Sequence, residues 1–310
     1  MVPDAQELQE QLEEERRRLL DDTSGDVGDP SLDEDDHDRF ALAAHAVDGT
    51  SAATAEAEVA FPVQSVVKPF VYAVALADDR EAVHRAVGVE PTGEPFDALV
   101  LELETGRPPN PMVNAGALMA ASLVAGSGVG EKVERVRAAC SAAAGRELVV
   151  DEEVVRAELE EADRNRALAH LMRGGGMLPV PVDDAVEVLA RVCAISVTTA
   201  DLATMAGTLA AWGRRPGSDE RVLPAVVVTE VLSVMATCGM YDGSGRWIHR
   251  AGLPAKSGVS GGLLAVAPGH LGLAAWSPRL DEQGNTVRGL QAGEALSEAW
   301  GLHPYGPPPG

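Results

Sequence analysis

The chain has 310 residues, 45% of them hydrophobic, and a formal net charge of −23 at pH 7. This length can bury a large core, and the negative charge repels phosphate backbones, so we expect a globular protein that does not bind nucleic acid. No apolar run reaches membrane-spanning length and no basic-plus-apolar leader is present, so we expect a soluble, cytoplasmic protein without a membrane partner. The three cysteines lie far apart, which argues against a disulfide framework or a metal site.

The first third of the chain begins with a charged helix. Residues 4–20 carry a thin leucine stripe, Leu8, Leu12, Leu19 and Leu20, which we expect to pack on the body of the protein rather than on a partner chain. Residues 21–38 contain the acidic run 33–36 and read as a solvated loop. Residues 40–47 predict a strand, 48–49 its turn and 53–59 the returning strand.

A serine and a lysine three residues apart open the next helix. Pro69 is tolerated only in a first helical turn, which places Ser65 at or just before the start of the helix. Lys68 lies one turn further on, so its amine can reach the Ser65 hydroxyl. A serine becomes nucleophilic when a base takes its proton, and lysine can be that base only where burial or neighbouring cations lower its pKa. An N-capping serine is the ordinary alternative.

The use of lysine favours the catalytic interpretation. The chain has three lysines, Lys68, Lys132 and Lys256, against twenty-two arginines. Arginine cannot lose its proton, so a chain that otherwise uses arginine has kept lysine where arginine could not serve. Lys256-Ser257-Gly258 also precedes a strand-like run, and with Ser-x-x-Lys it resembles the paired motifs of penicillin-recognising serine enzymes.

The middle of the chain is helical. Residues 88–100 predict a loop, and Asn114 is placed to cap a helix over 115–124. Further helices are predicted over 131–144, 151–172, 183–194, 199–212 and 222–236, then a hairpin of 263–267 with 271–276 and a closing helix over 289–301. Strands at both chain ends with helices between them predict an α+β fold, in which one antiparallel sheet is flanked by helices and carries an inserted all-helical lobe. We divide the chain into an N-terminal helix and acidic loop (1–38), a two-lobed catalytic domain (39–303) and a loose tail (304–310).

Seven blocks resemble, in order, the serine-dependent glutaminases, whose fold is beta-lactamase-like. They are residues 61–68 (FPVQSVVK), 89–96 (VEPTGEPF), 110–116 (NPMVNAG), 163–169 (DRNRALA), 193–198 (CAISVT), 237–242 (TCGMYD) and 252–262 (GLPAKSGVSGG). The resemblance implies hydrolysis of L-glutamine to L-glutamate and ammonia through an acyl-serine, with no metal or organic cofactor. It also implies a homodimer or homotetramer.

The resemblance assigns roles to individual residues. Ser65 resembles the nucleophile, Lys68 its base, and Tyr241 a phenol that relays a proton to the leaving ammonia. The N–H groups of Ser65 and Val259 resemble an oxyanion hole. The residues that resemble those gripping the substrate's α-amino and α-carboxylate groups are Gln64, Asn114, Glu158 and Asn165. Glu158 and Asn165 can face one pocket if their helix continues between them.

Two departures concern the substrate pocket. Family members carry a tyrosine before the first strand, where this chain has Gly28 to Leu32 without one, and a tyrosine four residues before the cysteine, where it has Leu189. A pocket that loses hydrogen-bond donors loses affinity and selectivity. An amidase acting on a different amide with the same serine and lysine is therefore an alternative. A catalytically silent amino-acid-binding protein is a third possibility, against which the retention of Ser65, Lys68 and Tyr241 argues.

Overall fold

The computed structural model describes residues 3–28, 36–93, 100–102 and 105–306. Its main sheet is antiparallel and five-stranded, in the order β3-β2-β9-β8-β7. The first two strands come from the N-terminal part, β2 (Ala41–Ala46) and β3 (Ser51–Ala53). The other three come from the C-terminal part, β7 (Ala255–Ser257), β8 (Gly262–Ala267) and β9 (Leu271–Trp276). The prediction that both chain ends share one antiparallel sheet is confirmed.

Alternating side chains place a different helical layer on each face of this sheet. Leu42 and Ala44 of β2 belong to one buried cluster with the helices α1 (Ala5–Leu19) and α11 (Val287–Ala299). Ala43, which points the other way, belongs to a second cluster with α8 (Thr199–Ala210). This is the period of two that a strand imposes. Leu8, Leu12 and Leu19 are buried, so the leucine stripe packs on the body as predicted, while Leu20 is exposed.

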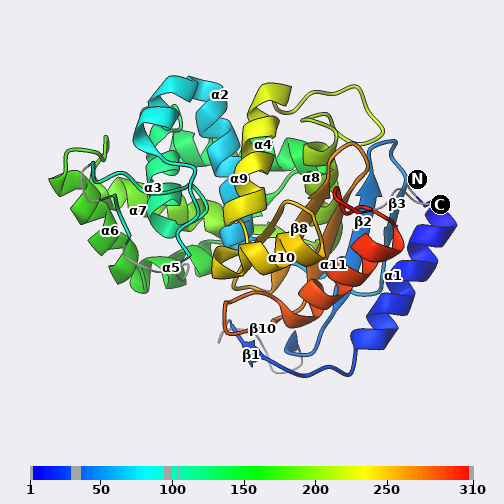
Figure 1. Ribbon diagram of the computed structural model, residues 1–310. Helices are drawn as coiled ribbons and strands as arrows, with labels where there is room; N and C mark the ends of the chain where they lie inside the picture. The colour runs from blue at the N-terminus through cyan, green and yellow to red at the C-terminus, as the bar shows by residue number, and fades with distance from the viewer. Residues whose placement is uncertain (1–2, 29–35, 94–99, 103–104, 307–310) are drawn as a thin grey trace.

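Six helices form a lobe beside the sheet (Figure 1). They are α2 (Lys68–Ala86), α3 (Asn114–Leu123), α4 (Val129–Ala144), α5 (Glu152–Glu160), α6 (Asp163–Gly174) and α7 (Val182–Cys193). Helices α9 (Ala225–Cys238) and α10 (Ser244–Arg250) return the chain to the sheet. A small sheet orders β4 (Phe61–Pro62), β6 (Ile195–Val197) and β5 (Val149–Val150), and β1 (Asp26–Val27) pairs with β10 (Arg279–Leu280).

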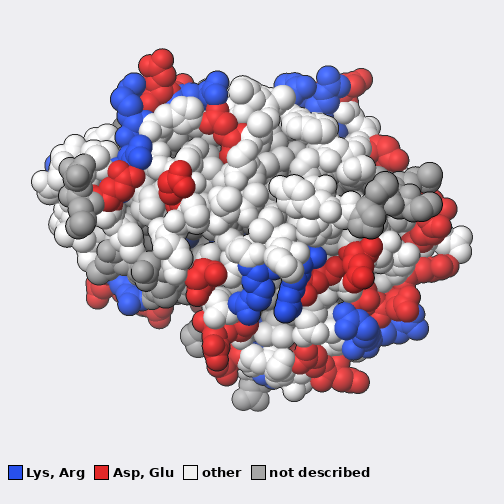
Figure 2. Space-filling view, in the orientation of Figure 1, with Lys and Arg blue, Asp and Glu red and all other residues white. Residues whose placement is uncertain are grey.

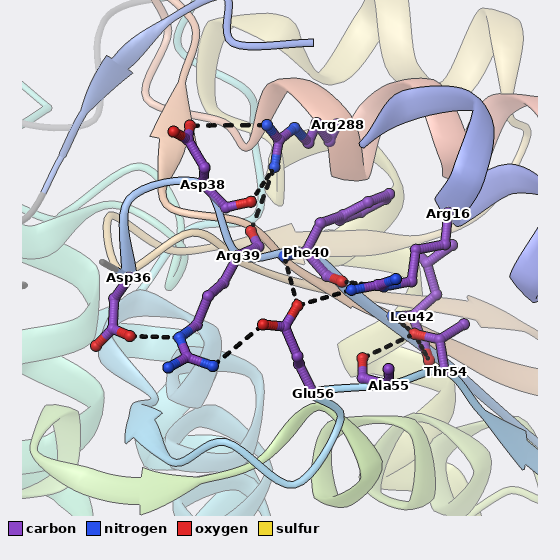
Figure 3. A network of polar contacts seen from close by, with 10 residues as sticks. All are labelled: Arg16, Asp36, Asp38, Arg39, Phe40, Leu42, Thr54, Ala55, Glu56 and Arg288. Carbon is purple, nitrogen blue, oxygen red and sulfur yellow. Dashed lines mark hydrogen bonds and ion pairs between the residues drawn. The ribbon is translucent and has the colours of Figure 1, made fainter. Parts of the chain in front are cut away.

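The returning strand predicted over 53–59 is wrong beyond Ala53. The chain turns at residues 55–58, where Glu56 has a φ of +68°. This turn lets the Glu56 carboxylate accept hydrogen bonds from Arg16 at 2.8 Å and Arg39 at 3.1 Å (Figure 3). Arg16 also donates to the Phe40 carbonyl at 2.7 Å, so the network ties α1 to the start of β2. Charge pairing between distant segments overrides the strand pattern here.

Two helical predictions also need correction. The helix predicted over 151–172 is broken at Glu161 and Ala162 into α5 and α6, and Asp151 caps the first part through the Glu153 and Val154 N–H groups. The helix predicted from residue 222 begins after Pro224, because a proline ring is best tolerated at a helix start. Short elements escaped prediction altogether: β1, β4, β5, β6, β7, β10 and α10.

The basic surface of the molecule is built from arginine, because all three lysines are buried. Figure 2 shows these basic groups interspersed with acidic ones on one face.

Within the described ranges no single helix is long and apolar enough to cross a membrane. The segments Ala225–Cys238 and Tyr241–Arg250 pass that test only as a pair, which is bent by 89°. Parts of four predicted segments lie outside the described residues. They are residues 29–32 of the segment that lacks a tyrosine, 33–35 of the acidic run, 94–96 of the second family block and 307–310 of the tail.

Candidate active site

Ser65 lies on a single-turn 3-10 helix, η2 (Gln64–Val67), directly before α2. The segment is held from behind, because β4 pairs with β6 and the Val63 N–H donates to the Ile195 carbonyl at 2.8 Å. Gln64 has a φ of +48°, an uncommon conformation for a residue other than glycine. Pro69 occupies the first turn of α2, as predicted. Val66, Val67 and Lys68 are buried, whereas Ser65 is partly exposed. Of these four side chains, only Ser65 is accessible to solvent.

Lys68 has the properties of a buried base. Its side chain is 1% exposed, and its Nζ donates to Asn114 Oδ1 at 2.7 Å and to the Met112 carbonyl at 3.3 Å. No carboxylate of the described residues forms an ion pair with it. Burial lowers the pKa of Lys68 from 10.5 to about 8, because the charged amine is poorly solvated there. A lysine with this pKa can accept a proton near neutral pH.

Asn114 is not the helix cap that its position suggested. It is the first residue of α3, and the Asn110 side chain instead accepts from the N–H groups of Met112 and Val113 at 3.0 and 3.2 Å. Asn114 is therefore free to accept from Lys68 and to donate to Asn165 Oδ1 at 3.2 Å. The capping interpretation is wrong, and the side chain instead belongs to the polar cluster beside Ser65.

Tyr241 lies behind the serine on a short 3-10 helix, η3 (Tyr241–Gly243), with a φ of +56°. Its hydroxyl donates to the Ser257 carbonyl at 3.1 Å. Burial raises the pKa of Tyr241 to about 12, and hydrogen bonds with Ser65 and Ser257 only partly oppose this effect. The phenol is therefore protonated at neutral pH and can donate a proton next to Ser65.

The turn between β7 and β8 brings Val259 to the other side of Ser65. Gly258 donates to the Gly262 carbonyl at 2.9 Å, and Gly261 has a φ of +88°. A Cβ on Gly258 would lie 3.4 Å from the Ser65 nitrogen, so the turn packs directly on the backbone of the serine. The turn therefore places Val259 beside Ser65 in the lining of one cavity.

A cavity of about 160 Å³ opens in front of Ser65. One wall is polar, and there Gln64 Nε2 donates to Glu158 Oε1 at 2.9 Å. The side chains that α7 adds to the lining, Leu189, Ala190 and Cys193, are apolar or weakly polar. The lining comprises Gln64, Ser65, Lys68, Asn114, Glu158, Asn165, Leu189, Ala190, Cys193 and Val259. The volume is well below the ~300–1,000 Å³ typical of pockets for drug-sized ligands, so the cavity suits a small molecule.

The structure brings the predicted residues together, with one difference in placement. Seven of them line the cavity, whereas Tyr241 adjoins Ser65 from behind and is not among the lining residues. Glu158 and Asn165 both reach the cavity although their helix does not continue between them. Cys193 and Ala190 were not predicted to line it; their position on the buried face of α7 beside Leu189 is the signal that could have indicated them. The described residues contain no group of three or more His, Cys, Asp or Glu that could hold a metal ion.

Comparison with known proteins identifies the family. The sequence model described as Glutaminase matches residues 28–305. A glutaminase of Clavibacter michiganensis subsp. michiganensis is 52% identical over 288 residues, covering 92% of this chain and 89% of that one, and a glutaminase of Corynebacterium efficiens is 46% identical over 301 residues, covering 96% and 71%. A solved structure of the probable glutaminase ybaS has a TM-score of 0.91 at 36% identity and covers 96% of this chain and 98% of its own. A solved Bacillus glutaminase has a TM-score of 0.87 at 33% identity, covering 97% and 99%. The fold is thus beta-lactamase-like, and the chain belongs to the glutaminase family.

Proposed function

We propose that this chain hydrolyses L-glutamine to L-glutamate and ammonia through an acyl-serine intermediate. The observation that carries the proposal is the arrangement of three side chains at the cavity. Ser65 is partly exposed, Lys68 has a pKa low enough to lose its proton near neutral pH, and Tyr241 beside them keeps its proton. Each of the three supplies one step that amide hydrolysis requires: attack, proton removal and proton donation.

In the first step Lys68 takes the Ser65 proton and the serine oxygen bonds to the side-chain amide carbon. The oxygen of the resulting tetrahedral intermediate carries negative charge and faces the Ser65 and Val259 N–H groups, which stabilise it. An amide nitrogen departs only once it is protonated, so Tyr241 donates its proton and ammonia leaves. The proton on Lys68 then passes to the Tyr241 phenolate, which restores both groups. Water attacks the glutamyl-serine ester, Lys68 takes the proton from that water, and the same proton passes to the Ser65 oxygen as the ester C–O bond breaks and L-glutamate is released.

Substrate orientation falls to the polar wall. Glu158 is the only acid among the described residues that line the cavity, and its carboxylate suits the α-ammonium of an amino acid. Gln64, Asn114 and Asn165 supply amide donors for the α-carboxylate. No step requires a metal or organic cofactor.

A second candidate is hydrolysis of a different amide by the same residues. Leu189, Ala190 and Cys193 present an apolar wall to the cavity, which favours a less polar substrate than one held by hydroxyl groups. Rates on a panel of amides that differ at the α-carbon and at the amide nitrogen separate the two candidates.

Ammonia release from L-glutamine by the purified protein, beside Ser65→Ala, tests the proposal. We expect release by the parent and none by the variant, and an electrophilic glutamine analogue should label Ser65 stoichiometrically. A folded parent that releases no ammonia and takes up no label would instead favour the silent-binder interpretation.

We also propose a homodimer or homotetramer that acts in the cytoplasm without nucleic acid or membrane partners. The family resemblance supports the assembly, and the charge of −23 opposes binding to phosphate backbones. Light scattering on the purified protein would return a monomer mass if the assembly is wrong, and cell fractionation would test the location.

A further inference from the structure

Asn110 is a buried side chain to which the steps above give no part. It is 1% exposed, lies in the loop before α3 and does not line the cavity. Its Oδ1 accepts hydrogen bonds from the N–H groups of Met112 at 3.0 Å and Val113 at 3.2 Å. Its Nδ2 donates to the Glu90 carbonyl at 2.8 Å. The side chain therefore closes a turn over residues 110–113 and ties that turn to the segment that follows α2.

The backbone around Asn110 leaves this turn little freedom. The Glu90 N–H donates to the Pro109 carbonyl at 3.0 Å, so the two segments are also joined through their main chains. The ring of Pro111 fixes the φ of the next residue in the turn. A Cβ on Gly116 would collide with the Asn110 carbonyl oxygen, so the first turn of α3 packs directly on the loop.

The turn supplies both acceptors of the Lys68 amine. One is the Met112 carbonyl, at 3.3 Å, and the other is Asn114 Oδ1, at 2.7 Å. Asn110 binds the N–H of Met112 itself and that of Val113, the residue directly before Asn114. Each acceptor is thus held within one residue of a backbone group that the Asn110 side chain fixes.

These acceptors determine how the Lys68 amine is oriented. A tetrahedral nitrogen has four positions, one of which is the bond to Cε. In Lys68 two more positions donate to the Met112 carbonyl and Asn114, so the direction of the fourth is set. The fourth position holds the lone pair of the neutral amine or the third hydrogen of the ammonium. The two acceptors also stabilise the charged form and so oppose the effect of burial.

We propose that Asn110 is a positioning residue for the base, because it fixes the two acceptors that orient the Lys68 amine beside Ser65. This inference rests on the proposed function. When the serine attacks, the O–H bond of Ser65 breaks and its proton bonds to the fourth position of the Lys68 nitrogen. The electron pair of that O–H bond leaves the serine oxygen able to bond to the amide carbon. A free amine would have to find this orientation in each turnover.

The position of the acid limb of kcat/KM for L-glutamine tests the proposal. Asn110→Ala removes the acceptor of the turn, so the ammonium of Lys68 loses support. The limb should move about one pH unit lower, the effect of one lost hydrogen bond to a charged group. The plateau should fall about 10-fold, because a weaker and less fixed base removes the proton more slowly. Asn110→Asp keeps the acceptor oxygens, and its limb should not lie below that of the parent.

Other charges near Lys68 stay the same in these variants. The titratable groups that act on its amine are Glu158 from α5, Cys193 from α7 and Lys256 from β7. Asn110→Ala alters none of them and adds no charge. A shift in the limb therefore reports the loss of the acceptors.

Nuclear magnetic resonance gives the same quantity without any activity. The chain has three lysines, so lysine labelled with carbon-13 at Cε gives a spectrum of three signals, and Lys68→Met identifies one of them. The Lys68 signal should titrate about one pH unit lower in Asn110→Ala than in the parent. If that variant does not fold, Asn110→Ser, whose shorter hydroxyl is a weaker acceptor, should move the midpoint in the same direction.

Ser122→Ala is the matched control. It removes another buried polar side chain next to α3, one that donates to the Leu118 carbonyl at 2.7 Å at the far end of the helix. It should lower stability without moving the Lys68 midpoint. An unmoved midpoint in the folded Asn110 variants, or an equal shift in Ser122→Ala, would overturn the role of Asn110. A parent that releases no ammonia, although the midpoint shifts as expected, would instead overturn the proposed function.

Discussion

Replacing Lys68 by methionine should abolish activity and stabilise the fold. The side chain of Lys68 is buried, and its pKa falls from 10.5 to about 8. Since one pKa unit corresponds to ~1.4 kcal/mol, the ammonium form lowers the free energy of unfolding by ~3 kcal/mol below about pH 8. Methionine fills a similar volume without a charge.

The lost hydrogen bonds oppose this gain. Without Lys68, the Met112 carbonyl lacks its lysine donor, at a cost of ~1–3 kcal/mol, while Asn114 lines the cavity and can bond to water. We therefore expect Lys68→Met to raise the free energy of unfolding by about 1–2 kcal/mol at about pH 7.

The pH dependence of this difference has a definite sign. The folded-state pKa lies below the unfolded-state value, so between about 8 and 10.5 the unfolded chain binds more protons and the parent gains stability as pH rises. The advantage of Lys68→Met should shrink by about 2 kcal/mol between about pH 7 and pH 9.5. Denaturant unfolding of the parent and of Lys68→Met at these two pH values measures the change in this stability difference. A variant less stable than the parent at both pH values, with a constant difference, would refute the reasoning.

Three other predictions concern the reaction. Because neutral Lys68 is the active form, kcat/KM should rise about tenfold per pH unit below about pH 8 and level off above it. Tyr241 keeps its proton in this range and should cause no fall in kcat/KM near neutral pH. A flat profile would contradict Lys68 as the base. Glu158→Gln should raise KM for glutamine about 10–100-fold with little loss of kcat, and the reverse pattern would place Glu158 in the chemistry. Gly258→Ala should lower kcat about 10-fold or more, because its Cβ would lie 3.3 Å from the Val63 carbonyl and displace the oxyanion turn. Gly245→Ala, which meets nothing within 4 Å, is the matched control, and equal activities would argue against a tight turn.

The long elements were predictable because each carries its own signal. The hairpin over β8 and β9 shows apolar runs around a Pro-Gly turn. Helix α8 begins with a capping box formed by Thr198 and Asp201, a start that can be recognised in a sequence. Strands of two or three residues, such as β4 and β6, are too short for any period to be seen. Their pairing is decided by tertiary contacts that hold Ser65 in place.

The polar side chains of the site were harder to place, because several roles fit each of them. The same asparagine can cap a helix or accept from a buried lysine, and the structure shows that Asn114 does the second, as the first residue of α3 and not its cap. Glu158 and Asn165 reach one cavity through a break between α5 and α6, not along one helix face. Helical spacing predicted the correct pair for the wrong reason.

The rarity of lysine was taken to favour catalysis, but the property that the three lysines share in the structure is burial. All three lysines are buried, but Lys132 does not line the cavity; it donates to the carbonyls of Ser122 and Val124 at the end of α3. A compact ammonium on a flexible stem can bond two converging carbonyls where a planar guanidinium is harder to fit. Burial lowers the pKa of all three lysines, so what distinguishes Lys68 is its place in the lining of the cavity beside Ser65. What distinguishes Lys256 is the Tyr241 ring beneath its amine. In a chain that uses arginine for its surface, each lysine is a buried hydrogen-bond donor first, and its neighbours decide whether it also takes part in proton transfer.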